Sequence, residues 1–106
     1  MLPSGPVYLS IPAQQHAFRR HRETFPACLP FLSEIVRSPD YIGQSPHHRE
    51  SGFELIGEVE DNSLIVLIAI RLQRDGDGRY LVRSFYPIDR NKLDRRLRKG
   101  FVTRTK

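Results

Sequence analysis

The chain of 106 residues carries 17 Lys and Arg against 12 Asp and Glu, a formal net charge of +5, and 39% of its residues are hydrophobic. This length is typical of one domain, assigned to residues 1–106, and suffices for a core without disulfides or a structural metal. The single cysteine, the missing signal-peptide pattern and the short apolar runs predict a reduced, cytoplasmic protein without a membrane segment.

The first half of the chain is predicted to be mainly helical. A short apolar run at Val7–Ile11 is followed by a proline and predicts a first strand. Apolar residues at helical spacing then predict a helix over Ala13–Thr24 and a second that starts near Pro30 and stops before Ser38. The polar segment Asp40–Ser51 contains Gly and Pro and is predicted to be a loop.

The second half is predicted to be a sheet followed by a helix. Three apolar segments, separated by short turn signals, predict antiparallel strands over Phe53–Val59, Leu64–Gln73 and Arg79–Ile88. Asp89–Lys99 then forms a basic helix, with its first residue as N-cap and Gly100 as C-cap. The order of elements predicts an α+β fold, with N-terminal helices packed on one face of an antiparallel sheet.

Pairing the strands across their turns assigns side chains to two faces of the sheet. The register sets Glu54 opposite Ala69, Ala69 opposite Ser84, and Ile70 opposite Arg83. One face is then hydrophobic, with Arg83 as its only charged member: Phe53, Leu55, Val59, Val66, Ile68, Ile70, Leu72, Leu81 and Phe85. The other is polar toward the row of Glu54 and Ser84, and its polar members are Glu54, Arg71, Gln73, Tyr80, Ser84 and Tyr86.

The polar face has two interpretations. A carboxylate, a guanidinium, a hydroxyl and phenols within reach of one another suit phosphate chemistry, because the carboxylate can take a proton and the guanidinium can neutralise a phosphorane. The same residues also fit a solvated sheet face with one cross-strand ion pair.

The histidines give a second set of candidates. His21 lies in the apolar stripe of the first helix, either as a hydrogen-bonded core residue or as a proton-transfer catalyst. His16 lies about 140° around the same helix, so the two cannot share a metal. His47 and His48 have no further ligands at metal-binding spacing, and no nucleotide-binding motif occurs, so no metal or cofactor is predicted. Cys28 is interpreted as a small buried residue rather than a nucleophile.

The basic excess is concentrated at the C-terminal end. It suits either a polyanion-binding surface or a solubilising tail. The candidate RNA-binding residues are Arg90, Lys92, Arg95, Arg96, Arg98 and Lys99.

Several short motifs, taken in order, carry a family resemblance. They are Val7-Tyr8-Leu9-Ser10, His16 with Arg20-His21, Leu29 to Ile35, Pro39 to Gly43, and Tyr80 to Tyr86. In this order the chain resembles the phage-associated nuclease domains of the Barnase-EndoU-colicin-RelE superfamily. The resemblance implies helices packed on an antiparallel sheet and metal-independent RNA cleavage by a toxin or effector.

The resemblance also implies site residues. A first-helix histidine matches His21, a Ser/Thr in the last long strand matches Ser84, and a basic position matches Arg71. However, the helix should cover the apolar face while Ser84 points to the other face. Either the helix curls over the sheet edge, or Arg83 rather than Ser84 joins His21.

The leading hypothesis is an endoribonuclease in which the RNA 2′-hydroxyl attacks the adjacent phosphate and leaves a 2′,3′-cyclic phosphate. The assigned roles are proton transfer by His21, phosphate charge neutralisation by Arg71 and Arg83, orientation by Ser84 and Tyr86, and a second base from Glu54 or His16. One alternative is a non-catalytic RNA-binding module in which Tyr80 and Tyr86 stack bases. Another is a protein-interaction domain whose basic helix binds an acidic partner, such as an immunity or antitoxin protein.

Overall fold

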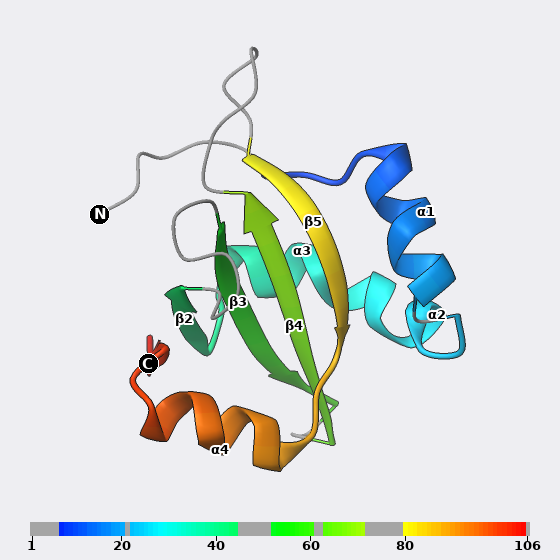
Figure 1. Cartoon of the computed structure of the whole chain (residues 1–106). Helices are drawn as coiled ribbons and strands as arrows, with labels where there is room; N and C mark the ends of the chain where they lie inside the picture. The colour runs from blue at the N-terminus through cyan, green and yellow to red at the C-terminus, as the bar shows by residue number, and fades with distance from the viewer. Residues whose placement is uncertain (1–6, 21, 45–51, 61–62, 72–79, 106) are drawn as a thin grey trace.

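A computed structural model describes residues 7–20, 22–44, 52–60, 63–71 and 80–105 (Figure 1). The helical elements are α1 (Ile11–Arg20), α2 (Phe25–Cys28), the 3-10 turn η1 (Leu29–Phe31), α3 (Leu32–Arg37) and α4 (Arg90–Arg98). The strands are β1 (Val7–Tyr8), β2 (Tyr41–Gln44), β3 (Gly52–Val59), β4 (Leu64–Arg71), β5 (Tyr80–Pro87) and β6 (Val102–Arg104). The predicted α+β fold with a C-terminal basic helix is confirmed.

The described strands form one sheet in the order β1-β5-β4-β3-β2-β6. All neighbours pair antiparallel except β1, which pairs parallel to the start of β5 through Val7–Tyr80 and Tyr8–Leu81. In Figure 1, α1 lies beside β5, α3 passes behind the sheet, and α4 lies across the lower end of the sheet.

Prolines divide the segment Phe25–Arg37 into three helical pieces, and the helix predicted to start near Pro30 corresponds to η1 and α3. Pro26 lies in the first turn of α2 and Pro30 in the first turn of η1, where a residue without an N–H is tolerated. Each proline therefore begins a new helical segment rather than continuing the preceding one. The helix α4 is capped as predicted, because the Asp89 side chain accepts a hydrogen bond from the Lys92 N–H at 2.7 Å. Gly100 follows the helix with a positive φ of 76°.

The prediction of a loop over Asp40–Ser51 is wrong at Tyr41–Gln44, which forms β2 between β3 and β6. Four residues with a glycine among them give a weak strand signal, and the strand exists because both of its edges are paired. The remainder of the predicted loop, including His47 and His48, lies outside the described residues.

The predicted register is confirmed between β3 and β4, where Glu54 pairs with Ala69, and between β4 and β5 as far as Ala69 and Ser84. Beyond that row a β-bulge shifts the pairing, so Ile70 lies opposite Val82 and not opposite Arg83. One extra residue on β5 therefore exchanges its faces beyond the bulge.

This exchange corrects the predicted composition of the hydrophobic face. Tyr80 and Val82 belong to the first core cluster, in place of the predicted Leu81 and Arg83. Tyr80, predicted on the polar face, is only 4% exposed, so its predicted role in stacking RNA bases is wrong.

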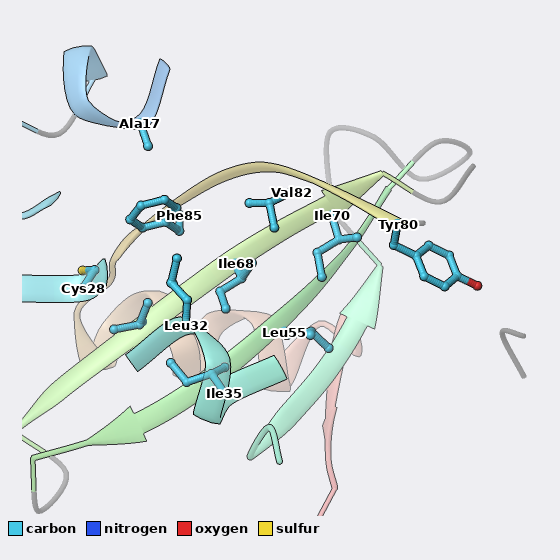
Figure 2. Packing of buried hydrophobic residues seen from close by; sticks show 11 residues of the cluster. Ala17, Cys28, Leu32, Ile35, Leu55, Ile68, Ile70, Tyr80, Val82 and Phe85 are labelled. Carbon is cyan, nitrogen blue, oxygen red and sulfur yellow. The ribbon is translucent and has the colours of Figure 1, made fainter. Parts of the chain in front are cut away.

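The first core cluster lies between the sheet and the N-terminal helices (Figure 2). Side chains of Ile68, Val82 and Phe85 project from β4 and β5 to the side that α3 covers with Leu32 and Ile35. This confirms that the N-terminal helices pack on one face of the sheet.

The second face of the sheet is covered in part, so the interpretation of its polar row as a fully solvated face is corrected. A second core cluster forms there, in which Leu93 of α4 packs with Ile56 and Leu67 of the sheet and with Val102 of β6. Leu97 packs against the same cluster. The basic helix is therefore amphipathic, and its apolar side covers the part of this face around Ile56 and Leu67.

Gly43 allows β6 to approach β2 closely. A Cβ at this position would lie 1.8 Å from the Phe101 carbonyl oxygen and 2.6 Å from the Val102 Cα, so two backbones would have to separate. We expect Gly43→Ala to destabilise the domain by about 1–3 kcal/mol or more in urea denaturation. Gly100→Ala, with no atom within 4 Å of the added Cβ, is the control and should lose only about 1 kcal/mol from its left-handed backbone. Equal losses would contradict this packing argument.

Candidate functional site

The candidate site lies on the second face, along one row of paired residues. The row runs from Ser84 on β5 through Ala69, Glu54 and Gly43 to Val102 on β6. On one side of this row α4 covers the sheet with Leu93 and Leu97; on the other side Arg71 of β4 is exposed. The polar row therefore borders the covered part of the face. Side chains at this border can be partly buried and still be reached from solvent.

Glu54 is held by a guanidinium from α4. Arg96 donates from Nε to Oε1 of Glu54 at 2.9 Å and from Nη2 to Oε2 at 3.4 Å. The Glu54 side chain is 3% exposed and that of Arg96 is 16% exposed. A carboxylate this deeply buried requires a hydrogen-bonded cation, and a two-pronged guanidinium supplies both charge and direction.

Tyr86 lies close to this ion pair on the same face. Its ring packs against the second core cluster. Burial raises the pKa of the Tyr86 phenol above its usual value of 10, the negative charge of Glu54 raises it further, and Arg96 opposes both effects. The phenol therefore stays protonated at neutral pH and can donate a hydrogen bond.

The bulge changes the position of Arg83. Val82 and Phe85 both face the first core cluster, and Ser84 pairs with Ala69 on the second face. Arg83 is the extra residue of the bulge, and a bulge of this kind turns its two consecutive side chains to one side of the sheet. Arg83 therefore lies beside Ser84, rather than among the apolar residues of the first face as predicted.

The strongest histidine candidate, His21, lies outside the described residues. The preceding helix is described: α1 ends at Arg20, and Phe18 contacts Phe25 edge-to-face at a centroid distance of 5.6 Å. Phe25 in turn contacts Phe85 of β5 at 5.2 Å. The end of α1 is thus anchored beside β5, the strand that carries Ser84.

The N-terminal elements lie along β5. In the described part of the chain, strand β1 pairs with Tyr80 and Leu81, and α1 and α2 contact β5. Both sequence-based arrangements of His21, with Ser84 over the sheet edge or with Arg83, remain predictions. His16 is exposed on α1. Among the residues described here, no group of three or more His, Cys, Asp or Glu side chains is positioned to hold a metal ion.

The basic helix divides its charges between two surfaces. Arg96 binds Glu54, and Arg90 forms an ion pair with Glu58, which also accepts a hydrogen bond from the Tyr41 hydroxyl at 3.0 Å. The four other candidates are largely solvent-facing: Lys92, Arg95, Arg98 and Lys99. Part of this outer surface is an open hollow of about 610 Å³ lined by Asn91, Asp94, Arg95, Leu97 and Arg98. Two of the six predicted RNA-binding residues are therefore tied to carboxylates of β3.

The ion pair between Arg96 and Glu54 was not predicted from the sequence, although the position of Arg96 in the helix indicates such a pair. Arg96 follows Leu93 by three positions and directly precedes Leu97, so it lies on the apolar side of α4. A charged residue on the buried side of a helix predicts a buried partner of opposite charge.

Cys28 is a buried member of the first core cluster, as predicted, and burial raises the pKa of its thiol from 9.0 to about 11. The unfolded chain therefore loses this proton at a lower pH than the folded chain does. We expect the free energy of unfolding to fall by about 2–3 kcal/mol between pH 9 and pH 11 through this group. Urea titrations of the wild type and Cys28→Ala should show a shallower alkaline decline in the variant. Identical slopes would contradict this assignment.

No helix within the described part of the chain has the length and apolar character needed to cross a membrane. In comparisons with known proteins, the family model described as phage-Barnase-EndoU-ColicinE5/D-RelE like nuclease 3 matches residues 2–95. No curated protein and no solved structure matches the chain significantly. The family match spans the first core cluster and most of the second, and it ends in the middle of α4, directly before Arg96.

Proposed function

The chain belongs to the phage-Barnase-EndoU-ColicinE5/D-RelE like nuclease family, and on this premise we propose that it is a metal-independent endoribonuclease. In the proposed reaction the RNA 2′-oxygen attacks the adjacent phosphorus and the bond to the 5′-oxygen breaks. The products are a 2′,3′-cyclic phosphate and a 5′-hydroxyl. RNA supplies its own nucleophile, so the protein needs to supply proton transfer and positive charge.

The observation that carries the proposal is the polar row on the second face. Ser84, Arg83 and the Glu54–Arg96 pair lie at the border of the surface that α4 covers, and Tyr86 lies within it. Hydroxyl, phenol and guanidinium groups are the donors that a phosphorane requires, and here rigid strands hold most of them.

We assign roles on this basis. His21 transfers a proton as acid or base, Arg71 and Arg83 neutralise phosphate charge, and Ser84 and Tyr86 orient the substrate. Glu54 or His16 is the candidate second base. These roles match the residues that the sequence predicted for phosphate chemistry.

The proposal is tested with purified protein, total RNA and EDTA, followed by analysis of the fragment ends. Fragments that end in 2′,3′-cyclic phosphate and 5′-hydroxyl groups would support metal-independent transesterification. Intact RNA that is retained at low salt and released at high salt would favour the non-catalytic binding module. Cleavage only when a divalent metal is restored would overturn metal independence.

The outer surface of α4 is proposed to hold the RNA backbone. Its exposed cations are Lys92, Arg95, Arg98 and Lys99. Replacing all four with Gln should flatten the dependence of log Kd on log salt concentration by about 3, at about 0.7 for each phosphate contact to single-stranded RNA. Arg37→Gln, an exposed arginine on α3, is the control and should leave the slope unchanged. An unchanged slope in the fourfold variant would move the RNA contacts elsewhere.

The basic surface also supports a biological context. We propose a toxin or effector that acts in the cytoplasm of the producing or a target cell, in keeping with the phage-associated nuclease family of the chain. An acidic immunity or antitoxin protein would complement the exposed cations of α4 and block access to RNA.

A further inference from the structure

Two carboxylates of β3 each bind an arginine of α4, but the two ion pairs differ in burial. In the pair of Glu58 with Arg90 the side chains are 15% and 50% exposed, whereas in the pair of Glu54 with Arg96 they are 3% and 16% exposed. A surface pair forms at little cost, but a buried pair must offset the loss of hydration of both charges. Packing alone would be served by apolar residues at the two inner positions.

Within the described part of the chain, the geometry of the inner pair leaves one edge of the guanidinium for a second anion. A guanidinium has five N–H donors in one plane, and Arg96 directs Nε and Nη2 at Glu54. The edge formed by Nη1 and the second Nη2 hydrogen points away from the carboxylate. This edge has the spacing that binds two oxygens of a phosphate. Lysine, with one compact ammonium group, cannot bind both anions in the same manner.

Electrostatics also favour a contact between Arg96 and a phosphate. A lone carboxylate in the row of Ser84 would repel the phosphodiester, whereas a neutralised carboxylate that holds a cation toward it does not. Ser84 and Glu54 lie in one row with only Ala69 between them, so the pair lies two strands away from the hydroxyl.

We propose that Arg96 contacts the scissile phosphate through its outer edge, and that Glu54 is the positioning residue that fixes Arg96 there. This assignment rests on the proposed function and removes Glu54 from the candidates for second base. Arg96 binds the non-bridging oxygens and exchanges no proton. The 2′-hydroxyl proton still goes to a separate base, and the 5′-oxygen still receives its proton from a separate acid.

The first test is the cleavage of an RNA oligonucleotide in EDTA by Glu54→Gln and Arg96→Lys. Glu34→Gln and Arg37→Lys on α3 are matched controls, because both residues are exposed. We expect kcat to fall about 10²-fold in both test variants. KM should stay close to the wild-type value, because α4 keeps its outer cations. The acid limb of the pH–rate profile should persist in Glu54→Gln.

Two results would overturn the assignment. One is a Glu54→Gln variant that loses both activity and the acid limb while Arg96→Lys stays active, which would identify Glu54 as the base. The other is wild-type kcat in both test variants. Melting curves of all four variants establish that the rates refer to folded protein.

A second measurement uses the wild-type protein and no cleavage. The guanidinium ¹⁵N–H signals, assigned with Arg96→Lys, are followed while 2′-O-methyl RNA, which cannot be cleaved, is added. A shift of the Arg96 signals that Glu54→Gln abolishes would support the proposal, and no shift would overturn it. If the wild type cleaves no RNA, the proposed function fails, and this measurement still decides whether Arg96 binds phosphate.

Discussion

Replacing Arg96 with Met should lower the free energy of unfolding by about 3–5 kcal/mol, because the Glu54 carboxylate would remain buried without a cation. Methionine fills a similar volume and packs beside Leu93 and Leu97, so the loss reports the missing charge rather than a cavity. Urea denaturation at pH 7 measures it.

Two further variants separate charge from packing. Replacing both partners, as Glu54→Leu with Arg96→Met, should restore most of the lost stability, since no unpaired charge remains. Arg90→Met removes the outer pair and should cost much less, because Arg90 is largely solvated. A double variant as unstable as Arg96→Met would contradict the explanation by charge.

Replacing His21 with Ala should reduce the cleavage rate about 10²- to 10⁴-fold, the usual contribution of one group that transfers a proton. The rate is measured on an RNA oligonucleotide in EDTA, below the melting temperature of the variant. In the proposed role of His21 as the group that transfers a proton, added imidazole should restore part of the activity of His21→Ala.

His16→Ala is the companion variant, since it removes an exposed imidazole from α1. We expect His16→Ala to lower the cleavage rate less than His21→Ala does, because His16 is proposed at most as the second base. Full activity of His21→Ala would contradict the assignment. A variant that loses stability but keeps its rate would identify His21 as a core residue instead.

The central rows of the sheet could be predicted because their signals are local. Strands β3, β4 and β5 are long and are connected in sequence. Their alternation of side chains therefore specified that Glu54, Ala69 and Ser84 lie in one row, and this prediction is confirmed. The same row is the core of the candidate site.

The bulge in β5 could not be predicted from alternation. Tyr80 and Val82 suit a buried face as well as Leu81 does. Alternation therefore does not decide which side chains before Arg83 face the core. Packing between neighbouring strands sets the position of the bulge, because Val82 pairs with Ile70 and both side chains belong to the first core cluster. The error moved Arg83 to the wrong face, although Arg83 remained a candidate in both arrangements.

The covering of the second face was missed because it depends on contacts distant in sequence. Strand β6 has three residues and pairs with β2, some sixty positions earlier. Helix α4 was predicted, but the surface on which it docks was not. Arg96 was consequently treated as one of several equivalent cations, whereas the structure joins it to Glu54.

The separation of Glu54 and Arg96 by 42 positions also bears on how the domain is made. Synthesis proceeds from the N-terminus, so the strand that carries Glu54 is made before the helix that carries Arg96. Until α4 is made and docks, the Glu54 carboxylate lacks this guanidinium, and the surface that Leu93 packs against has no cover. The order of synthesis thus makes the docking of α4 a late step in the assembly of the candidate site.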